Sequence, residues 1–254
     1  MLKILLARLQ QGHRTIGFPK TPPTLPDRFR GAPVIDPTKC PDGCRDCIAA
    51  CPTDAIALDG KSVDLGKCLF CTDCTTACTH GALTHSAEWS LAARKREDLV
   101  VTGEFKQRSA VLDEKMRRLF GRSLKLRQVS AAGCNACEAD VNVLGTVVFD
   151  LGRFGIQIVA SPRHADGLLI TGPVSENMRE ALKITYDAVP DPKIVIACGA
   201  CAISGGPFAG LPEQHNGCAG MVPVDLYIPG CPPSPITILD GLLRLIGRIE
   251  EGRK

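Results

Sequence analysis

The sequence has few aromatic residues, little net charge and no long apolar run. Aromatic residues make up 4% of the chain, and 30 Lys and Arg against 27 Asp and Glu leave a formal net charge of +3. Nucleic-acid-binding domains are usually strongly basic, so no nucleic acid is expected as the main partner. No run approaches the roughly 20 apolar residues that are needed to cross a bilayer.

The N-terminal stretch MLKILLARLQQGHR does not have the pattern of a secretory signal peptide. Its apolar run is short, basic residues stand on both sides, and no small-residue cleavage site follows. We therefore expect the protein to work in a reducing compartment. Clustered cysteines in such a compartment usually bind metal, and this chain has 14 cysteines.

Residues 40–85 contain an internal repeat rich in cysteine. CRDCIAACPTDAIAL at 44–58 aligns with CTDCTTACTHGALTH at 71–85. The pattern is that of two-cluster bacterial ferredoxins, in which the fourth cysteine of each unit ligates the other cluster. The expected ligands of the first [4Fe-4S] cluster are Cys40, Cys44, Cys47 and Cys78, and those of the second are Cys51, Cys68, Cys71 and Cys74.

Two details depart from that pattern. Cys40 and Cys44 are separated by one residue more than usual, and Thr79 stands where the first unit has Pro52. The alternative is a pair of zinc sites, which favour two separated C-x2-C pairs over a tight run of cysteines. The spacing therefore favours iron–sulfur clusters.

From residue 129 onward, short β-branched runs alternate with helical stretches, which is typical of an open parallel sheet. The expected strands are 155–160, 166–172, 193–198 and 224–229, and the expected helices are 176–189 and 234–252. The predicted fold class is α/β, with an α+β ferredoxin-like N-terminal domain followed by a flavodoxin-like open parallel-sheet domain. The expected boundaries are 1–39 for an N-terminal helix and extended arm, 40–90 for the ferredoxin-like domain, 91–128 for a basic helical linker, and 129–254 for the α/β domain.

A third group of cysteines falls on loops of the predicted sheet. Cys201 and Cys231 each follow a predicted strand, and Cys134 and Cys137 precede the first helix of the sheet domain. Ligands of open α/β sheets bind at the carboxyl ends of the strands, so these four thiols are expected at one rim and suit a cubane cluster.

The remaining cysteines leave an alternative open at this rim. Cys198 could join Cys134, Cys137 and Cys201 in a zinc site, although a cysteine at the end of an apolar strand is more often a small buried side chain. A redox disulfide between Cys134 and Cys137 lacks a thioredoxin-like context. Cys218 is expected to be an unligated loop thiol.

Four segments carry a resemblance to a known family. GCNACE, RFGIQIVASPRHADGLLITGPV, GACAISGG and VPVDLYIPGCPPSP resemble the small subunit of formate-hydrogenlyase-type membrane-bound [NiFe] hydrogenases and the homologous cluster subunit of complex I. The N-terminal part, with TIGFPKTPP, RFRGAP and eight cysteines, is similar to the two-cluster ferredoxin-like subunit of the same complexes. The resemblance thus implies a fusion of two subunits, with Cys134, Cys137, Cys201 and Cys231 holding the proximal [4Fe-4S] cluster.

The implied function is electron transfer through three [4Fe-4S] clusters to a large catalytic subunit of a group 4 [NiFe]-hydrogenase-type complex. The spacing of Cys134 and Cys137 resembles the hydrogenase branch, because the complex I subunit has adjacent cysteines there. The implied partners are the large subunit, membrane-embedded subunits and an electron donor or acceptor protein, at the cytoplasmic face of the cell membrane. The polypeptide itself is expected to do no bond-making chemistry.

Some interpretations stay open on the sequence alone. Glu138 is either a proton relay at the large-subunit interface or a plain surface or helix N-terminal acid. The alternative functions are the equivalent subunit of a nickel-free, complex I-like assembly, a stand-alone multi-cluster carrier, and a zinc-stabilised scaffold. The spacing of apolar and basic residues in 1–11 predicts an amphipathic helix. This helix either packs on this chain or docks on a membrane or a membrane subunit.

Overall fold

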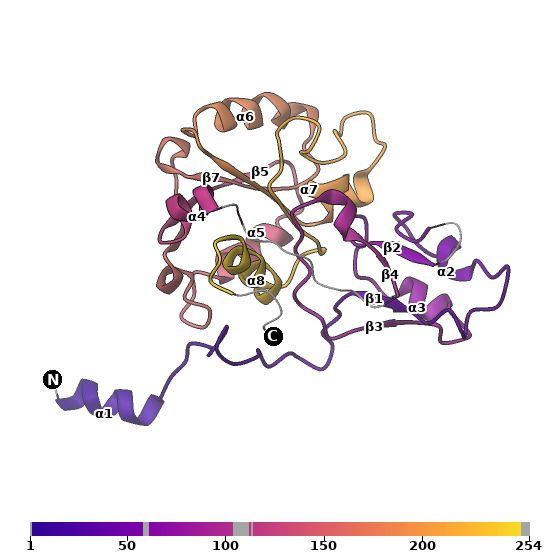
Figure 1. The fold of residues 1–254 in the computed structure, drawn as a ribbon, viewed down its shortest axis with the longest axis horizontal. Coiled ribbons are helices and arrows are strands. Elements are labelled where there is room, and N and C mark those ends of the chain that lie inside the picture. Colours follow the sequence, from indigo (N-terminus) through magenta and orange to yellow (C-terminus); the bar gives the residue numbers. More distant parts are fainter. Residues whose placement is uncertain (1, 58–60, 104–111, 113, 250–254) are drawn as a thin grey trace.

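The computed structural model describes residues 2–57, 61–103, 112 and 114–249. A ferredoxin-like part packs beside an α/β domain, and helix α1 lies apart from both (Figure 1). The helices are α1 (Leu2–Gln11), α2 (Asp46–Ala49), α3 (Asp73–Ala77), α4 (Glu114–Phe120), α5 (Ala136–Val143), α6 (Glu176–Asp187), α7 (Ala200–Ser204) and α8 (Pro235–Leu245). The strands are β1 (Pro33–Ile35), β2 (Ser62–Asp64), β3 (Leu83–His85), β4 (Val100–Thr102), β5 (Leu124–Ser130), β6 (Ile156–Ile158), β7 (Gly167–Thr171), β8 (Ile194–Cys198) and β9 (Leu226–Ile228).

The α/β domain is built on a five-stranded parallel sheet in the order β6-β5-β7-β8-β9. This is the flavodoxin-like order 2-1-3-4-5, in which the connection reverses direction between the first and third strands. The predicted fold class is therefore confirmed. The order places the loops after β5 and β7 at the switch point, where such sheets bind ligands.

Helices cover both faces of this sheet, so strands β7, β8 and β9 are buried along their whole length. In β8, Ile194 and Ile196 pack on one face with α8, whereas Val195 and Ala197 pack on the other with α6 and α7. Figure 1 shows α6 on one side of the sheet and α8 on the other. The apolar run that predicted a buried strand is explained by this two-sided burial.

The ferredoxin-like part consists of two antiparallel strand pairs and two short helices. Strand β1 pairs with β3, and β2 pairs with β4. Its apolar side chains, including Leu65, Phe70 and Leu83, share one continuous core with the α6–α7 face of the sheet. The two parts therefore pack against each other through a shared core and are not separate domains joined by a linker.

The segment 91–128, predicted to be a basic helical linker, differs from that expectation. Ala93 pairs with Tyr227 and extends the sheet beyond β9, and β4 belongs to the ferredoxin-like part. Strand β5 lies inside the sheet, between β6 and β7, and the helical turns that the structure describes in this segment are the 3-10 helix Arg96–Leu99 and α4. The α/β domain thus begins at β5, and residues 104–111 and 113 lie outside the described residues.

The arm that follows α1 is attached to the α/β domain by backbone contacts. Ile16 donates its N–H to the carbonyl of Val148 at 2.9 Å, and Thr15 donates its hydroxyl to the carbonyl of Val147 at 2.7 Å. The guanidinium of Arg153 donates to the carbonyls of Ile16 and Phe18. Among the described residues, no helix has the length and apolarity of a membrane span.

Candidate metal centres

Four thiols of the repeat, those of Cys40, Cys44, Cys47 and Cys78, lie together beside α2. They line one cavity with Ile35 and Leu83. Burial raises the pKa of the Cys47 thiol, and the neighbouring thiols of Cys78, Cys40 and Cys44 raise it further. The structure thus brings together the four cysteines predicted to hold the first cluster, including the one from the second repeat unit.

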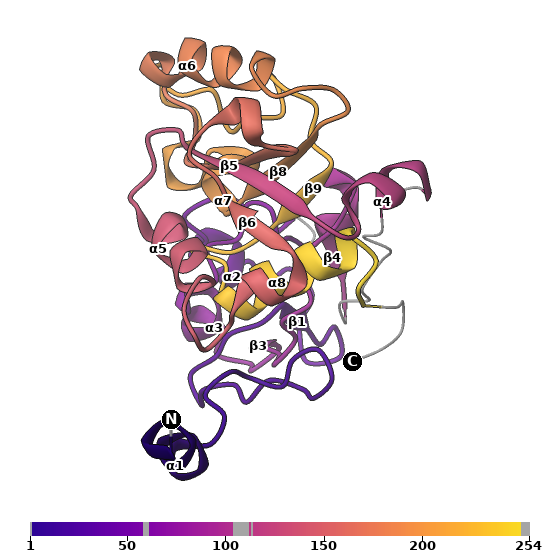
Figure 2. The same cartoon turned by 90° about the vertical axis from the view of Figure 1, so that its left-hand side faces the viewer.

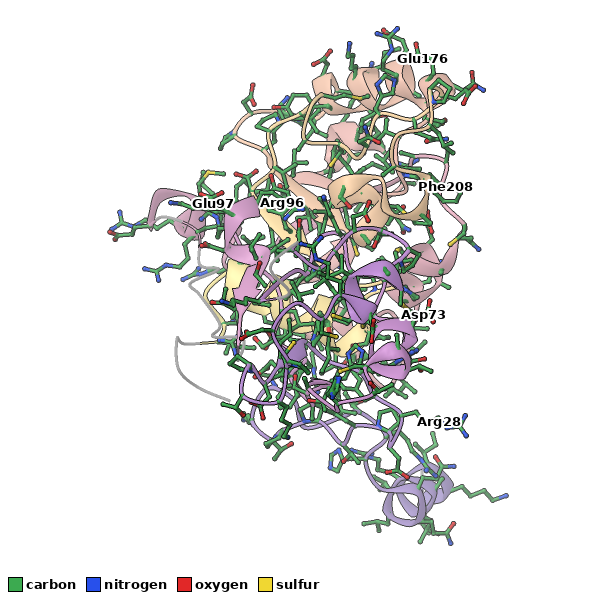
Figure 3. All side chains as sticks on the ribbon, turned by 90° about the vertical axis from the view of Figure 1, so that its right-hand side faces the viewer. Arg28, Asp73, Arg96, Glu97, Glu176 and Phe208 are labelled. Atoms are coloured by element: carbon green, nitrogen blue, oxygen red, sulfur yellow. The ribbon has the colours of Figure 1, made fainter. Side chains whose placement is uncertain are left out.

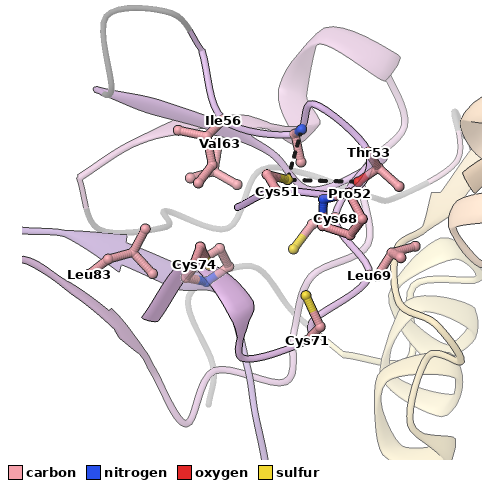
Figure 4. A pocket seen from close by; sticks show the side chains of 12 residues that line it. Cys51, Pro52, Thr53, Ile56, Val63, Cys68, Leu69, Cys71, Cys74 and Leu83 are labelled. Carbon is pink, nitrogen blue, oxygen red and sulfur yellow. Dashed lines mark hydrogen bonds between the residues drawn. The ribbon is translucent and has the colours of Figure 1, made fainter. Parts of the chain in front are cut away.

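The second predicted set, Cys51, Cys68, Cys71 and Cys74, lines a separate cavity with Ile56, Val63 and Leu83 (Figure 4). Burial raises the pKa of Cys68 to about 12, and the thiols of Cys74, Cys51 and Cys71 contribute to the rise. Burial likewise raises the pKa of Cys74 to about 11, with Cys71 and Cys51 adding to it. Because such thiols must lose their protons to bind iron, occupation of this site would release protons.

Backbone N–H groups point at sulfur in both repeat units. Ala55 donates to the sulfur of Cys51, and Ala82, its counterpart in the second unit, donates to the sulfur of Cys78, both at 3.3 Å. Phe70 donates to the sulfur of Cys68 at the same distance. Hydrogen bonds to sulfur stabilise added negative charge and thereby raise the reduction potential of iron–sulfur clusters. These contacts fit a thiolate-bound cluster.

The third set comes from three segments, each of which follows the carboxyl end of a sheet strand. Cys134 and Cys137 follow β5 at the switch point, Cys201 lies in α7 after β8, and Cys231 follows β9. Burial raises the pKa of Cys201 to about 12, with the thiols of Cys231 and Cys134 next in effect. Burial also raises the pKa of Cys137, to which the thiols of Cys198 and Cys201 add.

Glycines provide the space beside two of these sulfurs. A Cβ on Gly199 would lie 2.6 Å from the sulfur of Cys137, and one on Gly206 would lie 2.9 Å from the sulfur of Cys201. Both glycines have positive φ angles, +94° and +54°. The backbone therefore approaches the third site closely, in a conformation that favours glycine.

The three sets follow one another in space. The first two cavities share Leu83, and the thiol of Cys71 is close enough to Cys231 to raise its pKa, after burial and Cys134. Ser204, at the end of α7, donates its hydroxyl to the carbonyl of Gly66 at 2.9 Å, which ties the third site to the loop before Cys68.

Two positioning residues at the second set were not predicted from the sequence. Both ring nitrogens of His85 lie 3.1 Å from carbonyl oxygens, those of Gly31 in the arm and Cys71 in the ligand loop. Arg96 donates to both carboxylate oxygens of Asp64, at 2.7 and 2.6 Å, next to Gly66 (Figure 3 labels Arg96). The residues that His85 and Arg96 contact are distant from them in the sequence, so no local pattern indicates these contacts.

The other two cysteines are buried and apolar in their surroundings. Cys198 is fully buried in the core between the sheet and α8, as expected for a small strand side chain, and Cys218 lies in a loop with its side chain buried in the opposite core. All 14 cysteines are free. Within the described ranges, no group of three or more Cys, His, Asp or Glu side chains is placed to hold a single metal ion.

Glu138 is not a surface carboxylate. It lies in the first turn of α5, is 6% exposed, and its Oε1 accepts hydrogen bonds from Ser130 and Thr171, each at 2.6 Å. Burial raises the pKa of this carboxyl, but the two hydroxyls and its own backbone N–H outweigh that effect and lower it below the ordinary value. The group is therefore an ionised, fixed carboxylate directly beside Cys137.

Comparison with known proteins places the α/β domain in a family. Residues 134–245 match the model of the "NADH ubiquinone oxidoreductase, 20 Kd subunit" family. The chain is 41% identical over 132 residues to "Probable membrane-bound hydrogenase subunit mbhJ" of Pyrococcus furiosus, and the match covers 52% of this chain and 79% of that protein. The chain belongs to this family.

Two further relatives represent both branches of the family. Formate hydrogenlyase subunit 7 of Escherichia coli is 45% identical over 130 residues, which is 51% of each protein, so the match spans about half of that relative. A subunit of the NADH-quinone oxidoreductase of Bacteroides thetaiotaomicron is 40% identical over 141 residues, 55% of this chain and 70% of that protein. The predicted resemblance of the α/β domain is confirmed.

Proposed function

We propose that this chain is an electron-transfer subunit that holds three [4Fe-4S] clusters and passes electrons between a donor protein and the large catalytic subunit of a membrane-associated, group 4 [NiFe]-hydrogenase-type complex. When bound, such clusters accept and release single electrons. The ligands are the two predicted sets of the repeat and the set Cys134, Cys137, Cys201 and Cys231.

The succession of the three thiol groups supports this function most strongly. Leu69 lines both the cavity of the second set and the cavity that Cys231 borders, and the first two sets border the same side chain, Leu83. A zinc-stabilised scaffold would have no need for thiol groups in a row. Apolar side chains such as Ile35, Val63 and Leu83 line the first two cavities, and the N–H groups at Cys51, Cys68 and Cys78 stabilise added negative charge.

The N-terminal half extends the family domain, since the family match begins at Cys134. We propose that it is a fused two-cluster ferredoxin-like subunit, which supports electron entry from a donor protein at the first cysteine set. The assembly would also contain membrane-embedded subunits and lie at the cytoplasmic face of the membrane, because relatives are named membrane-bound hydrogenase and quinone oxidoreductase subunits.

Iron content and paramagnetism test the cluster count. Protein purified without oxygen should contain about twelve irons and as many acid-labile sulfides per chain, and should give electron paramagnetic signals upon reduction. Far fewer irons, or no such signal, would contradict the proposal. Size-exclusion of the native complex then separates a subunit from a stand-alone carrier, which would elute alone at the 27.1 kDa of this chain.

The partner decides between the two branches of the family. The C-x2-C spacing of Cys134 and Cys137 supports the hydrogenase branch over the complex I branch, so we expect nickel in the purified large subunit. A large subunit without cysteine pairs for nickel and iron would instead indicate a nickel-free, complex I-like assembly.

We further propose that Glu138 relays protons at the large-subunit interface. Its support is a carboxylate fixed by Ser130 and Thr171 next to a ligand of the third set. Replacing it by Gln should slow turnover of the complex while leaving the cluster spectrum intact. Unchanged turnover would reduce Glu138 to a structural acid of α5.

A further inference from the structure

Helix α1 makes no packing contact that buries any of its residues. It lies apart from the rest of the molecule in two perpendicular views (Figures 1 and 2). Its large apolar side chains are between 51% and 80% exposed, those of Leu2, Ile4, Leu5, Leu6 and Leu9. Exposed large apolar side chains gathered on one short helix mark an interaction site.

The apolar residues of α1 are not spread evenly around it. At about 100° per residue, four leucines fall within one side of the helix; we call Leu2, Leu5, Leu6 and Leu9 the leucine face. Lys3 and Arg8 flank that face, one on each side, whereas Ile4 falls on the opposite side. Long basic side chains in this position can keep their charges in water or on anionic groups while their stems follow an apolar surface.

The charge of the whole N-terminal segment has one sign. The first acidic residue of the chain is Asp27, and Lys3, Arg8, Arg14 and Lys20 all precede it. The segment 1–26 is therefore positive, whereas the complete chain is nearly neutral, with a formal net charge of +3. By charge complementarity, this segment favours binding to a negatively charged surface.

The point where the arm joins the α/β domain is apolar as well. Val147 and Val148 are 66% and 40% exposed, and their carbonyls receive the hydrogen bonds from Thr15 and Ile16. Gly12 directly follows the helix, with a φ of +64° and open space around it. A short arm thus fixes α1 near these valines without packing it against the domain.

We propose that α1 docks this protein on a membrane surface rich in anionic lipid. The leucine face enters the boundary between headgroups and acyl chains, and Lys3 and Arg8 meet the lipid phosphates. Aliphatic side chains without aromatic or hydrogen-bonding neighbours on that face suit fluid acyl chains better than a specific protein groove. The proposal adds a lipid contact to the function above and is tested without any electron-transfer measurement.

Vesicle flotation of the full-length, cluster-containing chain tests the leucine face. The variant with Leu5→Ser and Leu9→Ser should bind vesicles of mixed phosphatidylglycerol and phosphatidylcholine at least about tenfold more weakly, because two leucines leave the bilayer. The matched control is Ile4→Ser, a residue just as exposed on the other side of α1, which should bind like the unchanged protein. Equal binding by all three proteins would overturn the proposal.

Lipid charge provides a second, independent comparison. The unchanged protein should bind the mixed vesicles at least about tenfold more tightly than pure phosphatidylcholine vesicles, and added salt should reduce the difference. Equal affinity for both vesicle types would overturn the role of the basic residues. Loss of co-purifying membrane subunits in the leucine variant, with unchanged vesicle binding, would overturn the lipid surface in favour of a protein partner. Clusters that remain intact in every variant keep these outcomes separate from failure of the electron-transfer proposal.

Discussion

The sulfur of Cys137 leaves no room for a side chain on Gly199, because a Cβ there would lie only 2.6 Å from it. Gly199 precedes α7, so the loop after β8 packs directly against a thiol from the first turn of α5. Two ligand-bearing segments of the third site are thereby held together by one glycine. The contact joins residues from distant parts of the chain, so a substitution at Gly199 tests the third site directly.

Gly199→Ala should remove the third cluster and spare the other two. The added methyl displaces Cys137, so iron content should fall from about twelve to about eight per chain. Gly210→Ala is the matched control, because Gly210 also has a positive φ, +80°, but has nothing within 4 Å of a Cβ. Alanine also strains the backbone at both positions; the cost at Gly199, with φ +94° and ψ +155°, is about 1–3 kcal/mol. An equal loss of iron from both variants would show that backbone strain, not the contact with Cys137, is responsible.

Paired substitutions test whether the fourth cysteine crosses between the repeat units. Since Cys78 neighbours Cys47, Cys44→Ala combined with Cys78→Ala should damage a single cluster and leave about eight irons. Cys71→Ala combined with Cys78→Ala should damage two clusters and leave about four. The reverse ranking in iron content would assign Cys78 to its own unit.

The sheet was predictable where both faces of a strand are covered. Strands β7, β8 and β9 are continuous apolar runs because α6 and α7 pack on one side and α8 on the other. In β5 the buried Leu124 and Leu126 alternate with Lys125 and Arg127, which remain partly or fully accessible. The basic residues gave this segment the composition of a solvated linker. Only the alternation of apolar and polar residues is typical of a strand.

The grouping of the cysteines could be predicted because they follow a repeated local spacing or stand just after predicted strands. The contacts that position them are not local. His85 joins carbonyls of Gly31 and Cys71, and Ser204 reaches Gly66, across long intervals of sequence. Such pairs depend on how the ferredoxin-like part packs on the sheet, which composition and periodicity do not specify.

Glu138 should stabilise the protein in a pH-dependent way. Its pKa is lowered in the folded protein, so its contribution is fully present above the ordinary value of 4.5 and is lost as the pH falls through the folded pKa. In denaturant unfolding at neutral pH, Glu138→Gln should be less stable by about 1–2 kcal/mol, because two charge-assisted hydrogen bonds become neutral ones. The difference in the free energy of unfolding between the two proteins should become smaller at acid pH. A difference that grows on acidification would mean that the carboxyl is held in its protonated form.

A buried ion pair in α8 offers a test of stability away from the metal sites. Asp240 and Arg244 are 1% and 5% exposed, and Oδ2 of Asp240 accepts hydrogen bonds from Arg244 Nε at 2.9 Å and from Ser90 at 2.6 Å. Arg244→Leu leaves the buried carboxylate without its cation, so the free energy of unfolding should fall by about 3–5 kcal/mol. Adding Asp240→Leu removes that uncompensated charge and should restore most of the loss, measured by denaturant unfolding of the cluster-containing protein. A double variant no more stable than Arg244→Leu would show that the guanidinium acts through its packing rather than through its charge.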